Sequence, residues 1–411
     1  MTDDTINPVL RHAYGRVVAS LLREFGTSRL AMVEDGLSQA MLEATLAWRS
    51  RGVPENASAW LRRAARNRVI DELRRARFQG ELPETEDEDT AITPEPPGLT
   101  DDLHDDELSA LLACAAPTVP EPSQIVFALR TLCGFSTREI ANRLVTTEEN
   151  VQKRWERARD AMRSVDLQPT AEEWPSRVQS VLRMIYVLFT EGYFTSGGPT
   201  VLRLELCREA LRLAHLVAAH PRATTREAWA LLALLILHHA RRDARIDAEG
   251  MPVLLEDQDR SLYRRDELAL AFDAMQHAQV LDSKYHLEAA IAAEHAFAPT
   301  FAATRWEEIV RLYERLAQLE PSPLHVLHGT IARSYSEGPA VALAQLEAMR
   351  PPTWLAGSHR WLATFADFHR RLGDLERARS FYAQAIALAP PFERAVLERR
   401  RERLRSAVPG G

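Results

Sequence analysis

A single segment, residues 54–77, restricts most strongly what this chain can fold into. Its apolar residues recur at helical spacing and give one stripe: Trp60, Leu61, Ala64, Ala65, Val69, Ile70 and Leu73. Seven arginines crowd the remaining surface: Arg62, Arg63, Arg66, Arg68, Arg74, Arg75 and Arg77. The pattern predicts an amphipathic helix that packs on a core and binds a polyanion through its other face. A solvated basic face would have the same composition.

Charge is distributed unevenly along the chain. The 411 residues carry a formal net charge of −7, and they suffice for two or three domains. No Lys or Arg occurs between Arg77 and Arg130, where thirteen acidic residues fall. Residues 78–106 add proline to this charge and predict a disordered linker. The linker is a plain spacer or an acidic mimic of nucleic acid that shields the basic faces, and the two roles are compatible.

The periodicity in residues 8–77 predicts a helical bundle. A first helix ends at Gly26, and a second apolar pattern covers residues 33–49. Gly52 and Pro54 interrupt that pattern before the arginine-rich helix begins near Ser58. The core of this bundle is expected to come from the apolar stripes of the three helices.

Residues 107–165 contain a second helical unit. One helix starts at Ser136-Thr137, a short turn covers residues 145–147, and a further helix follows, with an apolar face made of Val151, Trp155, Ala158 and Met162. The small Ala141 allows the two helices to cross closely. This spacing is typical of a helix-turn-helix, and a generic helical hairpin has the same spacing.

Residues 174–405 again read as helices, so the fold class is predicted to be all-α. The segment 362–390 matches the tetratricopeptide (TPR) pattern of small, turn and exit residues at Ala366, Gly373, Ala378, Tyr382, Ala385 and Pro390. Because at least three such units are needed to bury a solenoid face, most of residues 174–405 are expected to be TPR-like.

Two motifs resemble a known family. WLRRAARNRVIDELRR (residues 60–75) resembles the promoter-melting helix of region 2 in extracytoplasmic-function (ECF) sigma factors of the sigma-70 family. TEENVQKRWERAR (residues 147–159) resembles the recognition helix of sigma region 4, with Asn150 in place of the usual threonine. A third segment resembles region 2.2 through Glu34, Asp35 and Gln39.

The C-terminal half resembles the same group. A subgroup of ECF sigma factors carries a helical, TPR-like extension, and residues 186–198 and 238–263 are similar to it. The resemblance implies a sigma factor that directs core RNA polymerase to promoters, with regions 2 and 4 joined by the linker. It implies no active site and no cofactor. The extension is expected to regulate activity, as a positive requirement or as a clamp on regions 2 and 4, and to bind a protein partner.

The resemblance also implies site residues. In region 4, base edges of the minus-thirty-five element would meet Asn150, Gln152, Lys153, Glu156 and Arg157, and phosphates would meet Arg154 and Arg159. In region 2, Asn56 and Ser58 would bind a flipped minus-ten base or cap the helix, with capping favoured for Ser58, and the DNA backbone would meet Arg62, Arg63, Arg66 and Asn67. Asp35 and Gln39 would contact the clamp helices of the polymerase beta-prime subunit; the beta flap is the second polymerase contact.

Other classes remain as alternatives. A TPR-linked helix-turn-helix regulator that does not bind core polymerase would not need the melting helix. An enzyme in the C-terminal half would need a catalytic site. His238 and His239, with the acidic residues between positions 243 and 259, are a poor set of metal ligands, because the side chains of adjacent histidines on a helix point in different directions. Salt bridges from Arg241, Arg242, Arg245 and Arg260 are expected to pack that loop instead.

Nothing in the sequence predicts a membrane segment or export. The longest apolar run, near residues 228–237, is about half of what a span needs, and the N-terminus lacks the apolar core of a signal peptide. Cys114, Cys133 and Cys207 are widely spaced and form no zinc pattern, so a reducing cytoplasm is expected.

Overall fold

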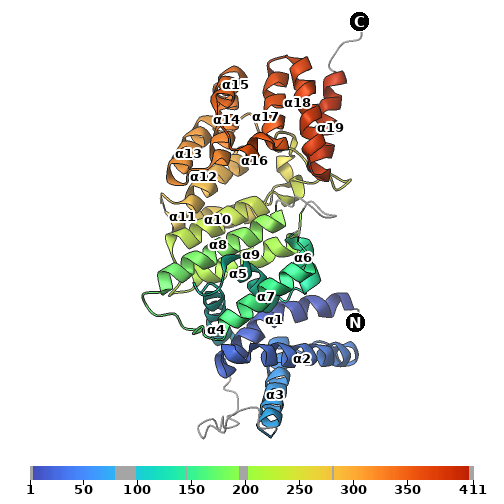
Figure 1. Cartoon of the computed structure of the whole chain (residues 1–411), viewed down its shortest axis with the longest axis vertical. Coiled ribbons are helices and arrows are strands. Elements are labelled where there is room, and N and C mark those ends of the chain that lie inside the picture. The colour runs from blue at the N-terminus through green and yellow to red at the C-terminus, as the bar shows by residue number, and fades with distance from the viewer. Residues whose placement is uncertain (1–2, 79–98, 145, 194–201, 280–281, 407–411) are drawn as a thin grey trace. The chain divides into compact units, whose positions relative to one another are not determined.

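The computed structural model describes residues 3–78, 99–144, 146–193, 202–279 and 282–406. Within these ranges the regular structure is helical, apart from one isolated bridge between Ile246 and Pro252 (Figure 1). The predicted all-α class is therefore confirmed for the described residues. The chain divides into two compact units, residues 1–185 and 186–411.

The first unit begins with three helices that pack on one another: α1 (Asp3–Phe25), α2 (Leu30–Arg51) and α3 (Ala57–Phe78). Their apolar stripes meet in a core that includes Val17, Leu21, Val33, Leu37, Leu61 and Val69. Gly26 and Gly52 both have φ of 83°, which ends α1 and α2 at the predicted positions because this left-handed region favours glycine. The arginine-rich segment is a helix, as predicted.

Five further helical elements complete the part of this unit that precedes residue 163. They are α4 (Leu99–Cys114), α5 (Glu121–Phe127), the π-helical turn η2 (Ala128–Leu132), α6 (Thr137–Arg143) and α7 (Glu148–Met162). A capping box between Ser136 and Glu139 starts α6, and the Thr147 hydroxyl accepts a hydrogen bond from the Asn150 amide to start α7. Both predicted helices are present, as α6 and α7, and the turn predicted at residues 145–147 includes residue 145, which lies outside the described residues.

The helix α4 corrects the linker boundary. It begins at Leu99, so the last eight residues of the predicted linker 78–106 are helical, while residues 79–98 lie outside the described part. The physical reason is that two acids near the linker's end are neutralised rather than solvated. Buried Asp106 pairs with Arg23 at 2.6 Å, and buried Glu107 lies 3.8 Å from Arg16.

Helix α1 packs directly on the second group of helices. A Cβ atom added at Gly15 would lie 1.9 Å from the Leu132 carbonyl oxygen, so the α1 backbone touches η2. The Thr27 hydroxyl donates to the Val165 carbonyl at 3.1 Å. The two helical groups expected to be separate thus form one compact unit.

The helix α8 (Trp174–Tyr193) carries the chain from the first unit into the second. The second unit continues with α9 (Leu204–Ala219), α10 (Arg226–His239), α11 (Arg265–Ala278), α12 (Lys284–Phe297), α13 (Trp306–Leu319), α14 (Pro323–Ser336), α15 (Pro339–Ala348), α16 (Thr353–Ala356), α17 (His359–Arg371), α18 (Leu375–Leu388) and α19 (Pro391–Ser406). Short 3-10 turns lie at Arg242–Ala244, Leu255–Asp257 (η4) and Arg260–Leu262. Most of these helices pack on their neighbours in sequence, and α12 packs mainly on α10 and α13.

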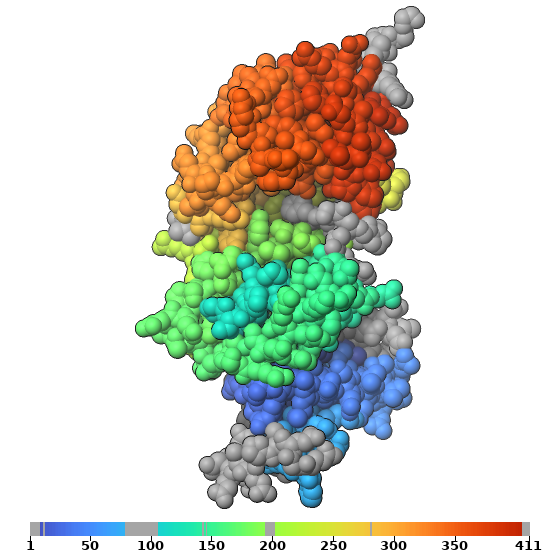
Figure 2. All heavy atoms as spheres, in the orientation of Figure 1, coloured from blue at the N-terminus to red at the C-terminus, as the bar shows by residue number. Residues whose placement is uncertain are grey.

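The pair α17–α18 has the small residues that the sequence singled out at the helix crossing. Ala366, Ala378, Tyr382 and Ala385 are buried in one cluster. Gly373, with φ of 82°, forms the turn between the helices. Together with α19 the pair makes a closely packed body, drawn in red in the space-filling view (Figure 2).

Candidate nucleic-acid interface

The basic face of α3 is divided into an anchored part and an exposed part. Arg66 donates to Glu24 of α1 at 2.6 Å, and Arg62 donates to the same carboxylate at 3.2 Å and to the Ser20 hydroxyl at 2.9 Å. These partly buried, charge-assisted contacts fix α3 against α1. Arg68 pairs with Glu43 of α2. The structure therefore uses three of the seven arginines to position the helix.

The exposed part contains Arg63 and Asn67 near the start of α3 and the arginines of its last turns. Arg75 pairs with Glu72 at 2.7 Å and Arg74 lies 3.8 Å from Asp71, both one turn apart on the surface. Exposed pairs of this kind contribute little to stability, so these side chains are available to a polyanion.

The N-terminus of α3 is capped by Asn56. Its side-chain oxygen accepts a hydrogen bond from the Ala59 amide at 2.9 Å. The interpretation that favoured Ser58 as the cap is wrong, because the helix begins one residue earlier, at Ala57. The Asn56 side chain remains exposed beside the loop that separates α2 from α3.

The exposed face of α2 carries more than the two residues that the sequence indicated. Asp35 and Gln39 are exposed, and Gln39 accepts a hydrogen bond from Arg68. Leu42 and Leu46 follow at helical spacing and are 68% and 70% exposed. Positions 35, 39, 42 and 46 recur three or four residues apart, so the sequence spacing alone could have placed these four side chains on one face of the helix.

Glu34, the neighbour of Asp35, faces the opposite way. It is buried, and its carboxylate accepts a hydrogen bond from the Thr131 hydroxyl of η2 at 3.2 Å. Burial raises the pKa of Glu34 to about 7, against the lowering effect of Arg130 and of the Thr131 hydrogen bond. Of the three residues that resemble region 2.2, two are thus on the surface and one is inside.

Helix α7 buries its predicted apolar face and presents the opposite face. Val151, Trp155, Ala158 and Met162 are buried, whereas Lys153 and Arg157 are exposed. Lys153 pairs with Glu149 at 2.6 Å, one turn away. The remaining predicted residues are half-buried: Asn150, Gln152, Arg154, Glu156 and Arg159.

Several of these half-buried side chains have partners within the unit. The Asn150 amide group donates to the Thr146 hydroxyl at 2.8 Å, and the Gln152 amide group donates to Glu156 at 2.8 Å. The Arg159 guanidinium lies over the Trp155 ring at 4.8 Å. These contacts hold the half-buried side chains of α7 in defined positions within the unit.

Arg130 was not among the residues predicted from the sequence. It is the first basic residue after the acidic segment that follows Arg77. Its guanidinium stacks on the Trp155 ring at 3.9 Å and donates to Gln152 and Thr137, each at 3.2 Å. Arg130 thus holds α7 and α6 on η2. The sequence feature that could have identified Arg130 is its position as a single basic residue before the two paired helices.

The acidic loop of the second unit pairs with α19, which corrects the expected salt bridges. Asp247 pairs with Arg399 at 2.8 Å, Glu256 pairs with Arg400, and Asp257 lies 3.3 Å from Arg403. Of the arginines expected there, Arg242 lies 3.8 Å from Asp243, as expected, and pairs more closely with Glu267 of α11, at 2.7 Å. Searching the described residues gives no group of three His, Cys, Asp or Glu that could hold a metal ion.

The described helices include none long and apolar enough to cross a membrane. All three cysteines are buried, and none of them forms a disulfide. Burial raises the pKa of the Cys207 thiol to about 12 and raises that of Cys114 as well. These thiols are therefore protonated and unreactive near neutral pH.

Comparison with known proteins assigns two segments. The family described as Sigma-70 region 2 matches residues 10–79, which cover α1 to α3, and the Family of unknown function (DUF6596) matches residues 177–279. An uncharacterized protein of Rhizobium meliloti (strain 1021) is 36% identical over 407 residues, which cover 95% of this chain and 93% of that protein. No solved structure matches.

Proposed function

We propose that this chain, which belongs to the same family as the Rhizobium meliloti protein and carries a Sigma-70 region 2 domain at residues 10–79, is an ECF sigma factor that directs core RNA polymerase to specific promoters. The observation that supports this best is α3: three of its arginines tie it to α1 and α2, and the others face outward. Sigma factors are typically non-enzymatic, and this one is proposed to act in the cytoplasm through binding alone.

Promoter melting is assigned to α3 and the loop before it. Extruding a base from the duplex costs a few kcal/mol of unstacking, which the protein must recover by contacts to the separated strand. Asn56 is exposed at the helix start, about two turns before the exposed Arg63 and about three turns before the exposed Asn67. We assign base contact to Asn56 and strand contact to Arg63 and Asn67. Arg62 and Arg66 contribute mainly by holding α3 in place.

Polymerase binding is assigned to the exposed stripe of α2. Asp35 and Gln39 supply polar contacts, and Leu42 with Leu46 supply the apolar centre that a stable protein interface needs. The proposed partner is the pair of clamp helices of the beta-prime subunit. The beta flap is proposed to contact the unit that contains α6 and α7.

Recognition of the minus-thirty-five element is assigned to α7 as the second helix of a helix-turn-helix. Such a helix enters the major groove, where donors and acceptors distinguish all four base pairs. Lys153 and Arg157 are exposed on the side opposite to the buried Trp155, which supports this orientation.

The compact first unit is proposed to be a resting form. Elements named minus ten and minus thirty-five are about 25 base pairs apart, which is about 85 Å of duplex at about 3.4 Å per step. A compact unit of 185 residues has a radius of gyration of about 16 Å and is about 40 Å across. The contacts of α1 with α4 and η2 must therefore open before both elements are bound together.

The helical second unit is proposed to regulate this step, as a TPR-like extension that replaces a separate inhibitor. We propose that it is required for a productive holoenzyme. Its stacked helices are suited to contacting a protein partner.

The test is reconstitution with core polymerase. The purified full chain is expected to co-elute with core polymerase and to support transcription from its own promoter and not from an unrelated one. A TPR-linked helix-turn-helix regulator would bind the promoter DNA without core polymerase, and transcription would not depend on it. That outcome would contradict the proposed function.

A further inference from the structure

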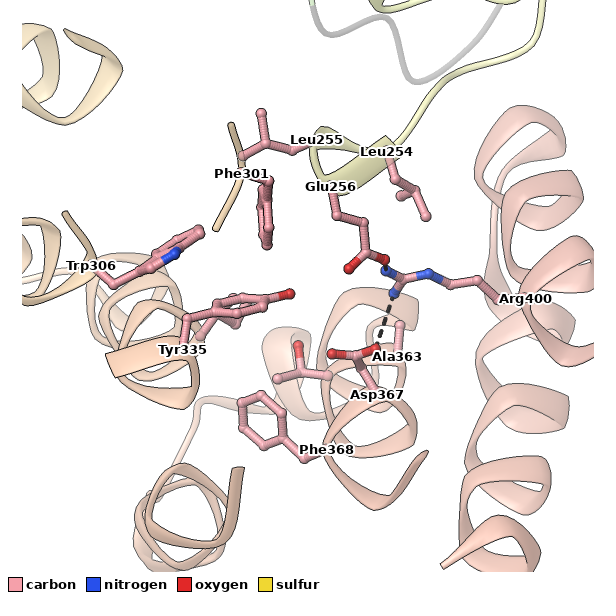
Figure 3. A pocket seen from close by; sticks show the side chains of 12 residues that line it. Leu254, Leu255, Glu256, Phe301, Trp306, Tyr335, Ala363, Asp367, Phe368 and Arg400 are labelled. Atoms are coloured by element: carbon pink, nitrogen blue, oxygen red, sulfur yellow. Dashed lines mark hydrogen bonds and ion pairs between the residues drawn. The ribbon is translucent and has the colours of Figure 1, made fainter. Parts of the chain in front are cut away.

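A pocket of about 250 Å³ lies within the second unit. Its wall is aromatic on one side, with Phe301, Trp306, Tyr335 and Phe368, and charged at the other end, with Glu256, Asp367 and Arg400 (Figure 3). The residues come from η4, the loop before α13, and helices α13, α14, α17 and α19. An apolar pocket with a few converging polar groups is the usual form of a small-molecule site.

The aromatic wall is held in one arrangement. Trp306 and Tyr335 stack with ring centroids 4.4 Å apart, and Phe301 meets both rings edge-on at 5.0 and 5.1 Å. The Tyr335 hydroxyl points toward the charged end of the pocket (Figure 3). The Arg371 guanidinium already lies 4.2 Å from the centroid of the Tyr335 ring, so the preformed π-surface open to a ligand belongs to Phe301, Trp306 and Phe368, beside the Tyr335 hydroxyl.

The charged end is built around two carboxylates. Arg400 reaches in from α19, pairs with Glu256, and lies 3.5 Å from Asp367. Asp367 also accepts from Arg370 at 2.7 Å. Burial, followed by the negative charges of Asp367 and Glu256, raises the pKa of Tyr335 to about 12, so its phenol remains protonated. The carboxylates thus already accommodate two cations, Arg400 and Arg370, which the chain itself supplies.

We propose that this pocket binds a small organic cation, a protonated amine or guanidinium on an apolar body. An anion would approach two carboxylates and the negative faces of aromatic rings. A cation gains from both, through charge-assisted hydrogen bonds and cation–π contact, while its apolar body covers the aromatic wall. Arg400 then acts as an internal competitor for Glu256 and Asp367. The site does not depend on the proposed sigma activity.

The test uses the full chain and three small probes of one size. Isothermal titration at neutral pH would compare phenethylamine, the neutral 2-phenylethanol and the anionic phenylacetate. Phenethylamine is expected to bind at least about tenfold more tightly than either analogue. Equal binding of the alcohol or the acid, or no binding of the amine up to millimolar concentration, would overturn the proposal.

Two substitutions are expected to change the affinity for the amine in opposite directions, which distinguishes an effect on the binding site from general destabilisation of the fold. Glu256→Gln removes one carboxylate and is expected to weaken amine binding about tenfold, whereas Arg400→Gln removes the competitor and is expected to strengthen it. Glu249→Gln, an exposed change in the same loop, is the matched control and should change nothing. Circular dichroism would verify that each variant is folded. Affinity that falls in Arg400→Gln, or stays constant in Glu256→Gln, contradicts the assignment.

Discussion

The Glu34 carboxylate of α2 accepts a hydrogen bond from the Thr131 hydroxyl of η2 at 3.2 Å, across 97 positions of sequence. This bond joins the Sigma-70 region 2 domain to the helices that follow the acidic segment. Next to it, Gly15 of α1 leaves no room for a side chain against the Leu132 carbonyl. The compact first unit is therefore held together in part by a titratable group and a backbone contact, and both can be tested.

The first prediction concerns pH. The pKa of Glu34 is raised from 4.5 to about 7 by burial, so the closed unit favours the protonated acid. As pH rises from about 4.5 to about 7, an unfolded chain releases this proton and the closed unit keeps it. The contribution of Glu34 to the free energy of unfolding is thus fully present below about pH 4.5 and falls by roughly 1–3 kcal/mol as the pH rises to about 7. Chemical denaturation at pH 5 and pH 8 measures the difference.

The matched variants for this prediction are Glu34→Gln and Glu43→Gln. The first removes the titrating group and should flatten the pH dependence of the free energy of unfolding between pH 5 and 8. The second changes an exposed glutamate of the same helix and should leave the dependence intact. A Glu34→Gln protein with the full wild-type dependence would show that another group titrates.

The second prediction concerns Gly15. A methyl group at this position meets the Leu132 carbonyl oxygen at 1.9 Å, so Gly15→Ala must push α1 away from η2. The strain is expected to cost about 1–3 kcal/mol and to populate an open unit. The variant should melt at a lower temperature and should show increased promoter-dependent transcription when polymerase is limiting.

The control is Gly357→Ala, where the added atom makes only an ordinary contact at 3.4 Å. Reduced transcription by a folded Gly15→Ala protein would contradict the resting form.

The third prediction concerns the exposed stripe of α2. Leu42→Asp and Leu46→Asp place charges at positions that are 68% and 70% exposed, so the fold should not suffer. Affinity for core polymerase is expected to fall by at least about tenfold, as for residues at the centre of an interface. The control is Leu388→Asp, at an exposed position of α18. Unchanged co-elution of both α2 variants with core polymerase would exclude this stripe as the contact.

The fourth prediction separates the two roles within α3. Arg63→Ala with Asn67→Ala is expected to abolish promoter melting and to leave stability unchanged, because both side chains are exposed. Arg62→Ala with Arg66→Ala leaves the partly buried Glu24 without its arginines and is expected to lower stability by about 1–3 kcal/mol. Permanganate reactivity of thymines reports melting, and thermal denaturation reports stability. Normal reactivity in the first double variant would rule out the assignment.

Local features were predictable from the sequence and long-range partners were not. Gly26, Gly52 and the Ser136 capping box act within a few residues, so helix ends follow from residue types. The pairing of Glu24 with Arg66 spans 42 positions, and the burial of Glu34 depends on η2. The composition of residues 99–106 favoured a disordered linker because it could not reveal that Arg23 neutralises Asp106. For the same reason the sequence grouped Arg62 and Arg66 with Arg63 as DNA contacts, because it could not reveal that Arg62 and Arg66 pair with Glu24.

The last prediction concerns the recognition helix. Arg157 is exposed on α7, and a bidentate contact to a guanine edge would be worth about 1–3 kcal/mol of discrimination. Arg157→Ala should therefore lose binding mainly at one position of the minus-thirty-five element. Lys153→Ala, on the same exposed face, is the comparison. If Lys153 contacts a phosphate, its removal weakens binding to all sequences equally and lowers the slope of log affinity against log salt concentration by about one. Binding measured against a set of single-base promoter variants at two salt concentrations distinguishes the roles. Uniform loss across all promoter variants in Arg157→Ala would show that Arg157 contacts phosphate and does not read sequence.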